Sequence, residues 1–107
     1  MFARNVSVRL KANSLKQFNE AFEKDVLPIL RKQPGFRDEI TLVSEDDMHV
    51  TAISIWESKE QAESYSTGAY PEVLKTLDKV IDGAPKVRLT KVGNSTMYKP
   101  AVVVAAA

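Results

Sequence analysis

Residues 36–62, FRDEITLVSEDDMHVTAISIWESKEQA, carry the pattern that decides the fold. Alternating apolar and polar side chains predict a strand over 36–43, and the acidic run 45–47 predicts the turn of a hairpin. The following strand, 49–56, has bulky apolar side chains on both faces, which is typical of a strand covered on both faces. Ser58 comes next as a helix N-cap, with capping-box spacing to Gln61. The stretch therefore predicts a strand, a turn, a strand and a helix.

The sequence on either side of this stretch extends the order to six elements. The helix begun at Ser58 is interrupted at Gly68, and a new helix opened by Pro71 and ended by Gly83 continues the same helical segment. The remaining predicted elements are a strand over 4–11, a helix over 14–33 that Pro28 kinks or tightens in its final turn, and a strand over 86–92. The order strand, helix, strand, strand, helix, strand is that of the ferredoxin-like split βαβ arrangement. The sequence thus predicts an α+β fold with a four-stranded antiparallel sheet and helices on one face.

The alternation also predicts which side chains meet the helices. The residues expected against the helices are Val6, Val8, Leu10, Ile40, Leu42, Ile53, Ile55, Val87 and Leu89. The residues expected on the open face are Asn5, Ser7, Arg9, Arg37, Glu39, Thr41, Val50, Ala52, Ser54, Trp56, Arg88 and Thr90. This second set is too polar for a dry core and too apolar around Trp56 for ordinary surface. We expect two copies to pair these faces and to leave a polar-lined cavity in each protomer.

Composition limits the classes of function. The 107 residues contain 15 Lys and Arg, 14 Asp and Glu, one His and no Cys. The net charge of +1 excludes a nucleic-acid binder that relies on a strong positive field, and the missing Cys excludes thiol and disulfide chemistry. No apolar run approaches the ~20 residues of a membrane span, and the N-terminus lacks the apolar region of a signal peptide. We therefore expect one cytoplasmic domain over 1–96, with a tail over 97–107 that docks on a partner subunit.

Two motifs resemble parts of a known family. The segment 27–37, Leu-Pro-Ile-Leu-Arg followed by Gln-Pro-Gly-Phe-Arg, resembles the first helix and second strand of the antibiotic biosynthesis monooxygenase family. The segment 54–62 followed by Tyr65 resembles that family's passage from strand to helix, where a Trp precedes a capping Ser or Thr. The resemblance covers residues 2–92 and implies the dimeric α/β-barrel superfamily, in which open sheet faces pair to form a dimer.

The resemblance implies a range of activities. Some members oxidise aromatic phenols or anthrones with O₂ and with no metal or flavin, while others degrade haem or isomerise small ring compounds. The haem-degrading branch uses a His on the helix that corresponds to 69–81, and this sequence has no His there. We therefore expect no cofactor and no metal. The resemblance also implies that Asn5 corresponds to an Asn on the first strand of the family.

The pattern of the strand faces and the family resemblance together indicate candidate site residues. Asn5, Trp56 and Tyr65 are the catalytic candidates, and Tyr70 beside Pro71 is a weaker one. The substrate-binding candidates are Ser7, Arg9, Glu39, Ser54 and Arg88. Each has a structural alternative: Trp56 as an interface anchor, Tyr65 as a core residue, and the polar strand residues as an ion-pair network. His49, near the hairpin turn, is expected to be solvated.

The function predicted from these residues is a cofactor-independent monooxygenase that oxidises a small aromatic or polyketide-like substrate with O₂. O₂ is a triplet and reacts slowly with closed-shell molecules, unless the substrate forms a stabilised anion that hands over an electron. The protein then needs only to exclude water, stabilise the anion and hold the reactants together. Two alternatives stay open: a non-catalytic dimeric module that binds a small ligand, and a small isomerase or lyase. The last would need a titratable residue inside the cavity, for which Glu39, His49 and Tyr65 are the candidates.

Overall fold

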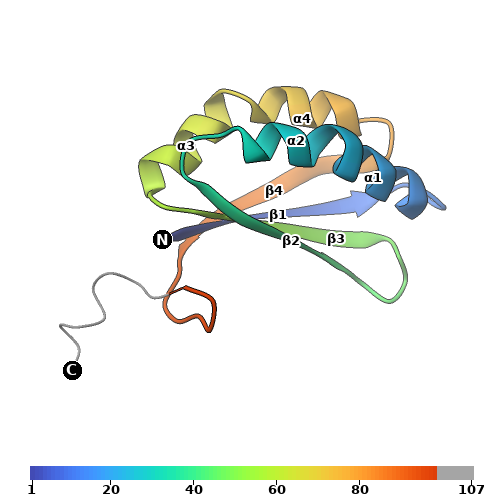
Figure 1. The fold of residues 1–107 in the computed structure, drawn as a ribbon. Helices are drawn as coiled ribbons and strands as arrows, with labels where there is room; N and C mark the ends of the chain where they lie inside the picture. The colour runs from blue at the N-terminus through green and yellow to red at the C-terminus, as the bar shows by residue number, and fades with distance from the viewer. Residues whose placement is uncertain (99–107) are drawn as a thin grey trace.

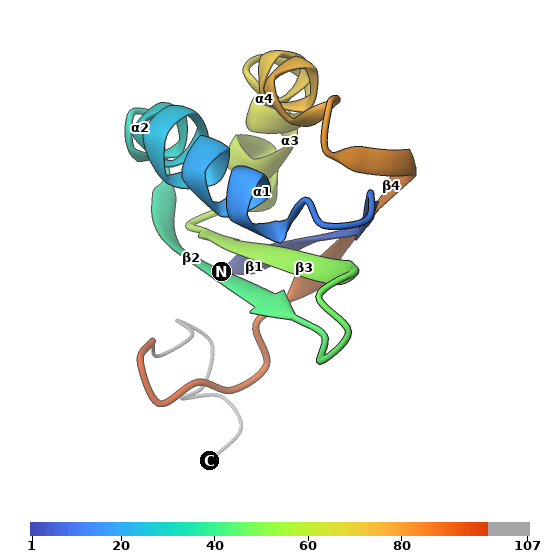
Figure 2. The same ribbon diagram turned by 90° about the vertical axis from the view of Figure 1, so that its right-hand side faces the viewer.

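The computed structural model describes residues 1–98, which form a helical layer on one face of a single sheet (Figures 1 and 2). The elements are β1 (Phe2–Leu10), α1 (Leu15–Ala21), the π-helical η1 (Phe22–Val26), α2 (Leu27–Arg31), β2 (Phe36–Val43), β3 (His49–Trp56), α3 (Lys59–Thr67), α4 (Tyr70–Leu77) and β4 (Ile81–Lys91). The sheet is antiparallel in the order β2-β3-β1-β4. The predicted ferredoxin-like α+β fold is confirmed.

The first helical segment is continuous from α1 through α2, and beside Pro28 it widens rather than tightens. The widening takes the form of the π-helical turn η1, in which the Leu27 N–H donates to the carbonyl of Phe22, five residues back. Pro28 has no N–H to continue the regular ladder, so the wider turn immediately before it accommodates the missing donor. The segment presents Phe18, Phe22, Val26 and Leu30 to the sheet, and all four are buried.

The second helical segment is divided as the sequence predicts. The Ser58 hydroxyl accepts a hydrogen bond from the Gln61 N–H and caps α3, and Gly68 ends that helix. Gly35 before β2 is required by its surroundings. Its φ of +81° lies in the left-handed region, and a Cβ there would overlap the side chain of Gln61. The loop before β2 therefore fits closely against α3.

The last strand begins earlier than predicted. The sequence predicts an end to the helix at Gly83 and a strand from 86, whereas β4 starts at Ile81 and runs through Gly83 to Lys91. Its pairing with β1 shifts between Ser7 and Arg9, and Gly83 has a φ of +83°. Gly83, Ala84 and Pro85, which the sequence predicts to end the helix, therefore form a β-bulge within β4.

The predicted faces are correct for β1 and β4 and wrong for β2 and β3. Val50, Ser54 and Trp56 of β3 are buried against the helices, and the register places them beside Val8, Arg4 and Phe2 of β1. On β2, Glu39 and Thr41 pair with Ser54 and Ala52 and so share the helix-facing side. The residues predicted there, which instead lie on the open face, are Ile40, Leu42, Ile53 and Ile55. Both strands are therefore turned over relative to the prediction.

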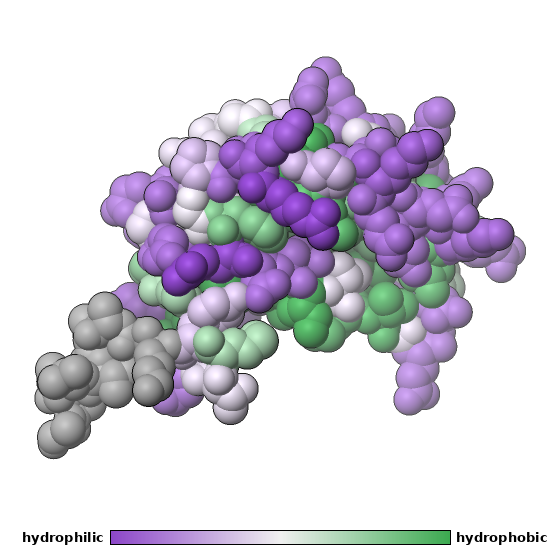
Figure 3. Space-filling model, in the orientation of Figure 1, coloured by the Kyte–Doolittle hydropathy of each residue, from purple (hydrophilic) through white to green (hydrophobic). Residues whose placement is uncertain are grey.

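The open face of the sheet consequently carries exposed apolar side chains. Ile40 is 55% exposed and Leu42 is 50% exposed, while Ile53 and Ile55 beside them on β3 are half-buried. Figure 3 shows hydrophobic side chains along the lower margin, over β2 and β3, beneath a largely hydrophilic helical layer. At the same face, the Tyr98 hydroxyl donates to Asp38 of β2 within one chain. Residues 99–107 of the predicted docking tail lie outside the described residues.

Candidate functional site

A cavity lies between the sheet and the helices. Its lining is mostly apolar and comes from both helical segments and all four strands, with Arg4, Glu39, Ser54, Tyr65 and Tyr70 as the polar or amphipathic members. Its volume is about 50 Å³, enough for a few water molecules but below the roughly 300–1,000 Å³ of ligand pockets. A ring-sized ligand therefore enters only when lining side chains move. This cavity lies on the helix-facing side of the sheet, because β3 turns Val50, Ser54 and Trp56 toward the helices. The cavity expected between the open faces of two copies stays a prediction.

Aromatic rings form one wall of this region. Tyr65 on α3 lines the cavity and stacks on Trp56, with ring centroids 5.1 Å apart, and Tyr70 at the start of α4 lies 5.9 Å from Tyr65. Trp56 is fully buried behind Tyr65, and its indole N–H donates to the Ser54 hydroxyl at 2.8 Å. The Tyr70 hydroxyl is buried and has no hydrogen-bond partner within the described part of the chain. The wall thus combines a rigid stack with one hydroxyl that is free to bond a ligand.

Arg4 places a buried cation beside these rings. Its side chain lies on the helix-facing side of β1 and is only 3% exposed. The guanidinium carbon is 3.9 Å from the ring centroid of Tyr70 and 5.1 Å from that of Tyr65, and the Nε–H donates to Ser66 at 2.7 Å. Among residues 1–98, Arg4 forms no ion pair with a carboxylate. The cation is held by ring faces and one hydroxyl, so its charge remains available to an anionic group.

Glu39 places a carboxylate at the same cavity. It lies on β2, and the Thr41 hydroxyl donates to it at 2.8 Å. Burial raises the pKa of the Glu39 carboxyl above its ordinary value, the hydrogen bond from Thr41 lowers it, and the nearby charge of Asp38 raises it. Burial also raises the pKa of the Tyr65 hydroxyl to about 12, an increase that the charge of Arg4 reduces. At neutral pH Tyr65 is therefore a neutral hydrogen-bond donor, and Glu39 is the acidic side chain of the cavity.

The structure brings five of the predicted site residues together, the weaker candidate Tyr70 among them. Tyr65, Glu39 and Ser54 line the cavity, and Trp56 supports Tyr65 and Ser54 from behind. Arg4 is the principal member that the sequence argument did not name. The signal was present: the alternation of Val6, Val8 and Leu10, extended backwards, places Arg4 on the same apolar face.

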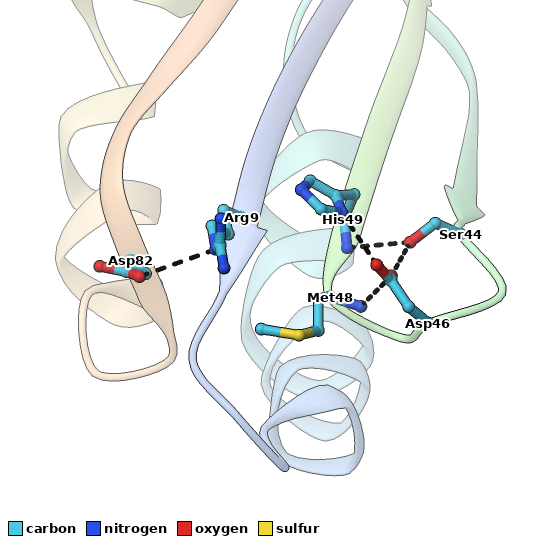
Figure 4. Close-up of polar contacts among 6 residues, drawn as sticks. All are labelled: Arg9, Ser44, Asp46, Met48, His49 and Asp82. Carbon is cyan, nitrogen blue, oxygen red and sulfur yellow. Dashed lines mark hydrogen bonds and ion pairs between the residues drawn. The ribbon is translucent and has the colours of Figure 1, made fainter.

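The other predicted site residues lie on the open face, away from the cavity. Asn5 donates to Thr90 and to the carbonyl of Arg88 across β1 and β4. The register places the side chains of Ser7, Arg9 and Arg88 on that same side. Figure 4 shows Arg9 facing Asp82 at 3.9 Å, and His49 at the hairpin end, 3.4 Å from Asp46. Both ion pairs are exposed, so His49 is solvated as predicted.

Residues 1–98 hold no group of three or more metal-ligating side chains that lie together. None of the helices in this range combines the length and the apolar character that crossing a membrane requires.

The comparison with family models decides the relationship that the motifs indicate. The model for antibiotic biosynthesis monooxygenase matches residues 1–73, about two thirds of the chain. The chain belongs to the antibiotic biosynthesis monooxygenase family. The resemblance stated from the sequence is thereby confirmed, and the match includes Arg4, Glu39, Tyr65 and Tyr70. No curated protein sequence matches the chain.

Solved structures share the fold of this family member. One is a monooxygenase from the gene ActVA-Orf6 of Streptomyces coelicolor with the ligand nanaomycin D, at 18% identity and a TM-score of 0.75, covering 92% of each chain. Another is SnoaB of Streptomyces nogalater, a cofactor-independent oxygenase, at 14% identity and a TM-score of 0.72, covering 89% of this chain and 95% of the other. A third, NE2512 of Nitrosomonas europaea, is of unknown function, at 11% identity and a TM-score of 0.74, covering 94% of each chain. At these identities the likeness establishes the fold alone.

Proposed function

We propose that this protein is a cofactor-independent monooxygenase that binds a small aromatic substrate in the cavity between its sheet and its helices. The observation that carries the proposal is Arg4, a buried guanidinium beside two tyrosine rings with no carboxylate paired to it in the described residues. Such a group matches an aromatic molecule that bears an acidic oxygen, because it can hold the oxyanion while the rings pack on the substrate. Family membership and the oxygenase of the same fold support this reaction class.

The chemistry follows from what an anion can do with O₂. A substrate held as its delocalised anion can donate an electron to O₂, which a neutral closed-shell molecule does slowly. For a ring CH₂ group the balanced outcome is CH₂ + O₂ → C=O + H₂O, in which carbon is oxidised and O₂ supplies both oxygen atoms. The protein's part is to bind the anion at Arg4 and to exclude water with its apolar lining.

We also propose that the protein acts as a homodimer joined through the open sheet face. Ile40 and Leu42 are about half exposed there, next to Ile53 and Ile55, and burial of such a patch favours association. In a dimer joined through this face, each cavity would still be lined by residues of one chain, because the cavity lies on the opposite side of the sheet. The cytoplasmic location stays a prediction from the sequence.

Oxygen uptake with a panel of hydroxyaromatic compounds tests the proposed reaction. The expected result is consumption of O₂ that depends on protein and falls at least tenfold in Arg4→Met, while Glu57→Gln, an exposed change outside the cavity, behaves as wild type. Binding without O₂ uptake would contradict the oxygenase and favour the non-catalytic module. A specific observation, the partly buried carboxyl of Glu39 at the cavity, favours a proton-transfer isomerase as the second candidate. Conversion of a substrate in the absence of O₂ would identify that activity.

A further inference from the structure

Three polar residues form a row across the helix-facing side of the sheet. The register places Glu39 of β2 opposite Ser54 of β3, and Ser54 opposite Arg4 of β1. The strands lie about 4.8 Å apart, so the Cα atoms of Glu39 and Arg4 are separated by about 10 Å. All three side chains line the cavity, and in the next row along these strands Val6 and Ala52 are apolar while Thr41 bonds Glu39.

The two ends of the row carry opposite charges that do not neutralise each other. Arg4 and Glu39 form no ion pair among the described residues, and Ser54 between them accepts its hydrogen bond from Trp56. Arg4 is bonded to Ser66, and Glu39 is bonded to Thr41. A guanidinium and a carboxyl therefore face one cavity from the two ends of this row, which costs solvation energy that a direct ion pair would partly offset. This separation leaves room for a ligand group that interacts with both.

Among the described residues that line the cavity, Glu39 carries the only carboxylate. The charged or titratable side chains that line the cavity are Arg4, Glu39, Tyr65 and Tyr70, and Asp38 lies just outside it on β2. Tyr65, with its pKa raised to about 12 by burial, keeps its proton at neutral pH. His49 lies at the exposed hairpin end. Glu39 remains, and its buried position raises the pKa of its carboxyl, which makes it a stronger base than an exposed carboxylate.

We propose that Glu39 accepts the hydroxyl proton of an aromatic substrate while Arg4 binds the oxyanion that results, with Tyr70 as a further donor. This assignment rests on the proposed function, since it uses the same cavity. In the step, the substrate O–H bond breaks, its electron pair stays on the oxygen beside Arg4, and the proton moves to a carboxylate oxygen of Glu39. No oxidant is needed for this transfer, so it precedes O₂ and occurs without it. Substrates are therefore hydroxyaromatics that enter neutral and are held as anions.

The test uses para-nitrophenol, a single-ring probe whose anion, unlike its neutral form, absorbs visible light. Binding is measured without O₂, about one pH unit below the probe's own pKa, where the free compound is about tenfold more neutral than ionised. Two quantities are recorded: the visible absorbance of the bound probe, and the protons released to solvent, from calorimetry in buffers of different ionisation enthalpy. Circular dichroism checks that each variant is folded, and Glu57→Gln is the matched carboxylate control.

Wild type is expected to bind the visible, anionic form with almost no proton release, because Glu39 retains the proton. Glu39→Gln is expected to release about one proton for each anion bound, or to bind the neutral form. Arg4→Met is expected to lose the visible band, and Arg4→Lys to recover part of it. Anion binding by Glu39→Gln without proton release, or neutral binding by wild type, would overturn the assignment and leave the cavity as a binding site. No binding at all would overturn the proposed function together with the assignment.

Discussion

Replacing Tyr70 by Phe is expected to stabilise the protein and weaken ligand binding. The Tyr70 hydroxyl is buried with no partner within the described residues, although its ring is only partly buried. An unsatisfied buried polar group costs about 1–3 kcal/mol. The lower end applies here because the hydroxyl lies at a cavity where local rearrangement can relieve it. We therefore expect Tyr70→Phe to raise the free energy of unfolding by about 1 kcal/mol and Tm by about 4–8 °C.

Differential scanning calorimetry and urea unfolding measure the gain in stability, and a para-nitrophenol titration measures the loss in affinity. One lost hydrogen bond is worth about 0.5–1.5 kcal/mol, or about two- to tenfold in Kd. Tyr98→Phe is the matched control, since its hydroxyl bonds Asp38 at the surface, and its effect is expected within about 0.5 kcal/mol. A Tyr70→Phe protein that is less stable than wild type would refute the reasoning, because it would mean that the hydroxyl has a partner.

Three further predictions follow from the arrangement of the sheet. Trp56→Ala is expected to lose about 3–5 kcal/mol of stability in urea unfolding, since the ring is fully buried; a stable, folded variant would contradict this core role. Ile53→Asp, and equally Ile40→Asp, is expected to keep the fold and to yield monomers in sedimentation, whereas unfolding would place these residues in the core. The raised pKa of Glu39 means that the folded state holds this proton more tightly than the unfolded chain. Protonated Glu39 therefore contributes to the free energy of unfolding at low pH. This contribution is lost as pH rises from 4.5 through the higher pKa that the carboxyl has in the folded state. Glu39→Gln should gain stability over wild type across that window in urea titrations, and a pH-independent difference would contradict the assignment.

Element order was predictable because each element carries local signals. Ser58 caps α3, Pro71 opens α4 and Pro28 perturbs the first helical segment, and each acts through its own backbone chemistry. Gly83 was misinterpreted because a Gly-Ala-Pro segment ends a helix as readily as it forms a bulge. Only the pairing with β1 shows that the strand continues through it.

The faces of β2 and β3 could not be predicted from alternation alone. On β3, Ile53 and Ile55 are as hydrophobic as Val50 and Trp56, so the pattern does not say which set meets the helices. On β2, the register shifts between Phe36 and Asp38, which changes the side that each later residue takes. Phe36 packs on the core and Glu39 lines the cavity, although three positions separate them.

These reversals explain why some of the predicted site residues meet at the cavity while the others lie on the open face. Trp56, Ser54 and Glu39 were expected to share one face, and they do, but that face meets the helices. Asn5 and Arg9 were expected to join them, yet β1 presents Arg4 to the cavity instead. A buried cation on an apolar strand face is an unusual feature of a sequence. It becomes informative only when the register shows which residues surround it.

A crystal structure of the protein with para-nitrophenol tests the location of the site most directly. The account predicts a ring between the helices and the sheet, packed on Tyr65, with its phenolic oxygen within hydrogen-bond distance of Arg4 and with Tyr70 displaced to admit it. A ring bound on the open face, against Ile40 and Ile53, would contradict the account, because the cavity on the helix-facing side would then have no ligand.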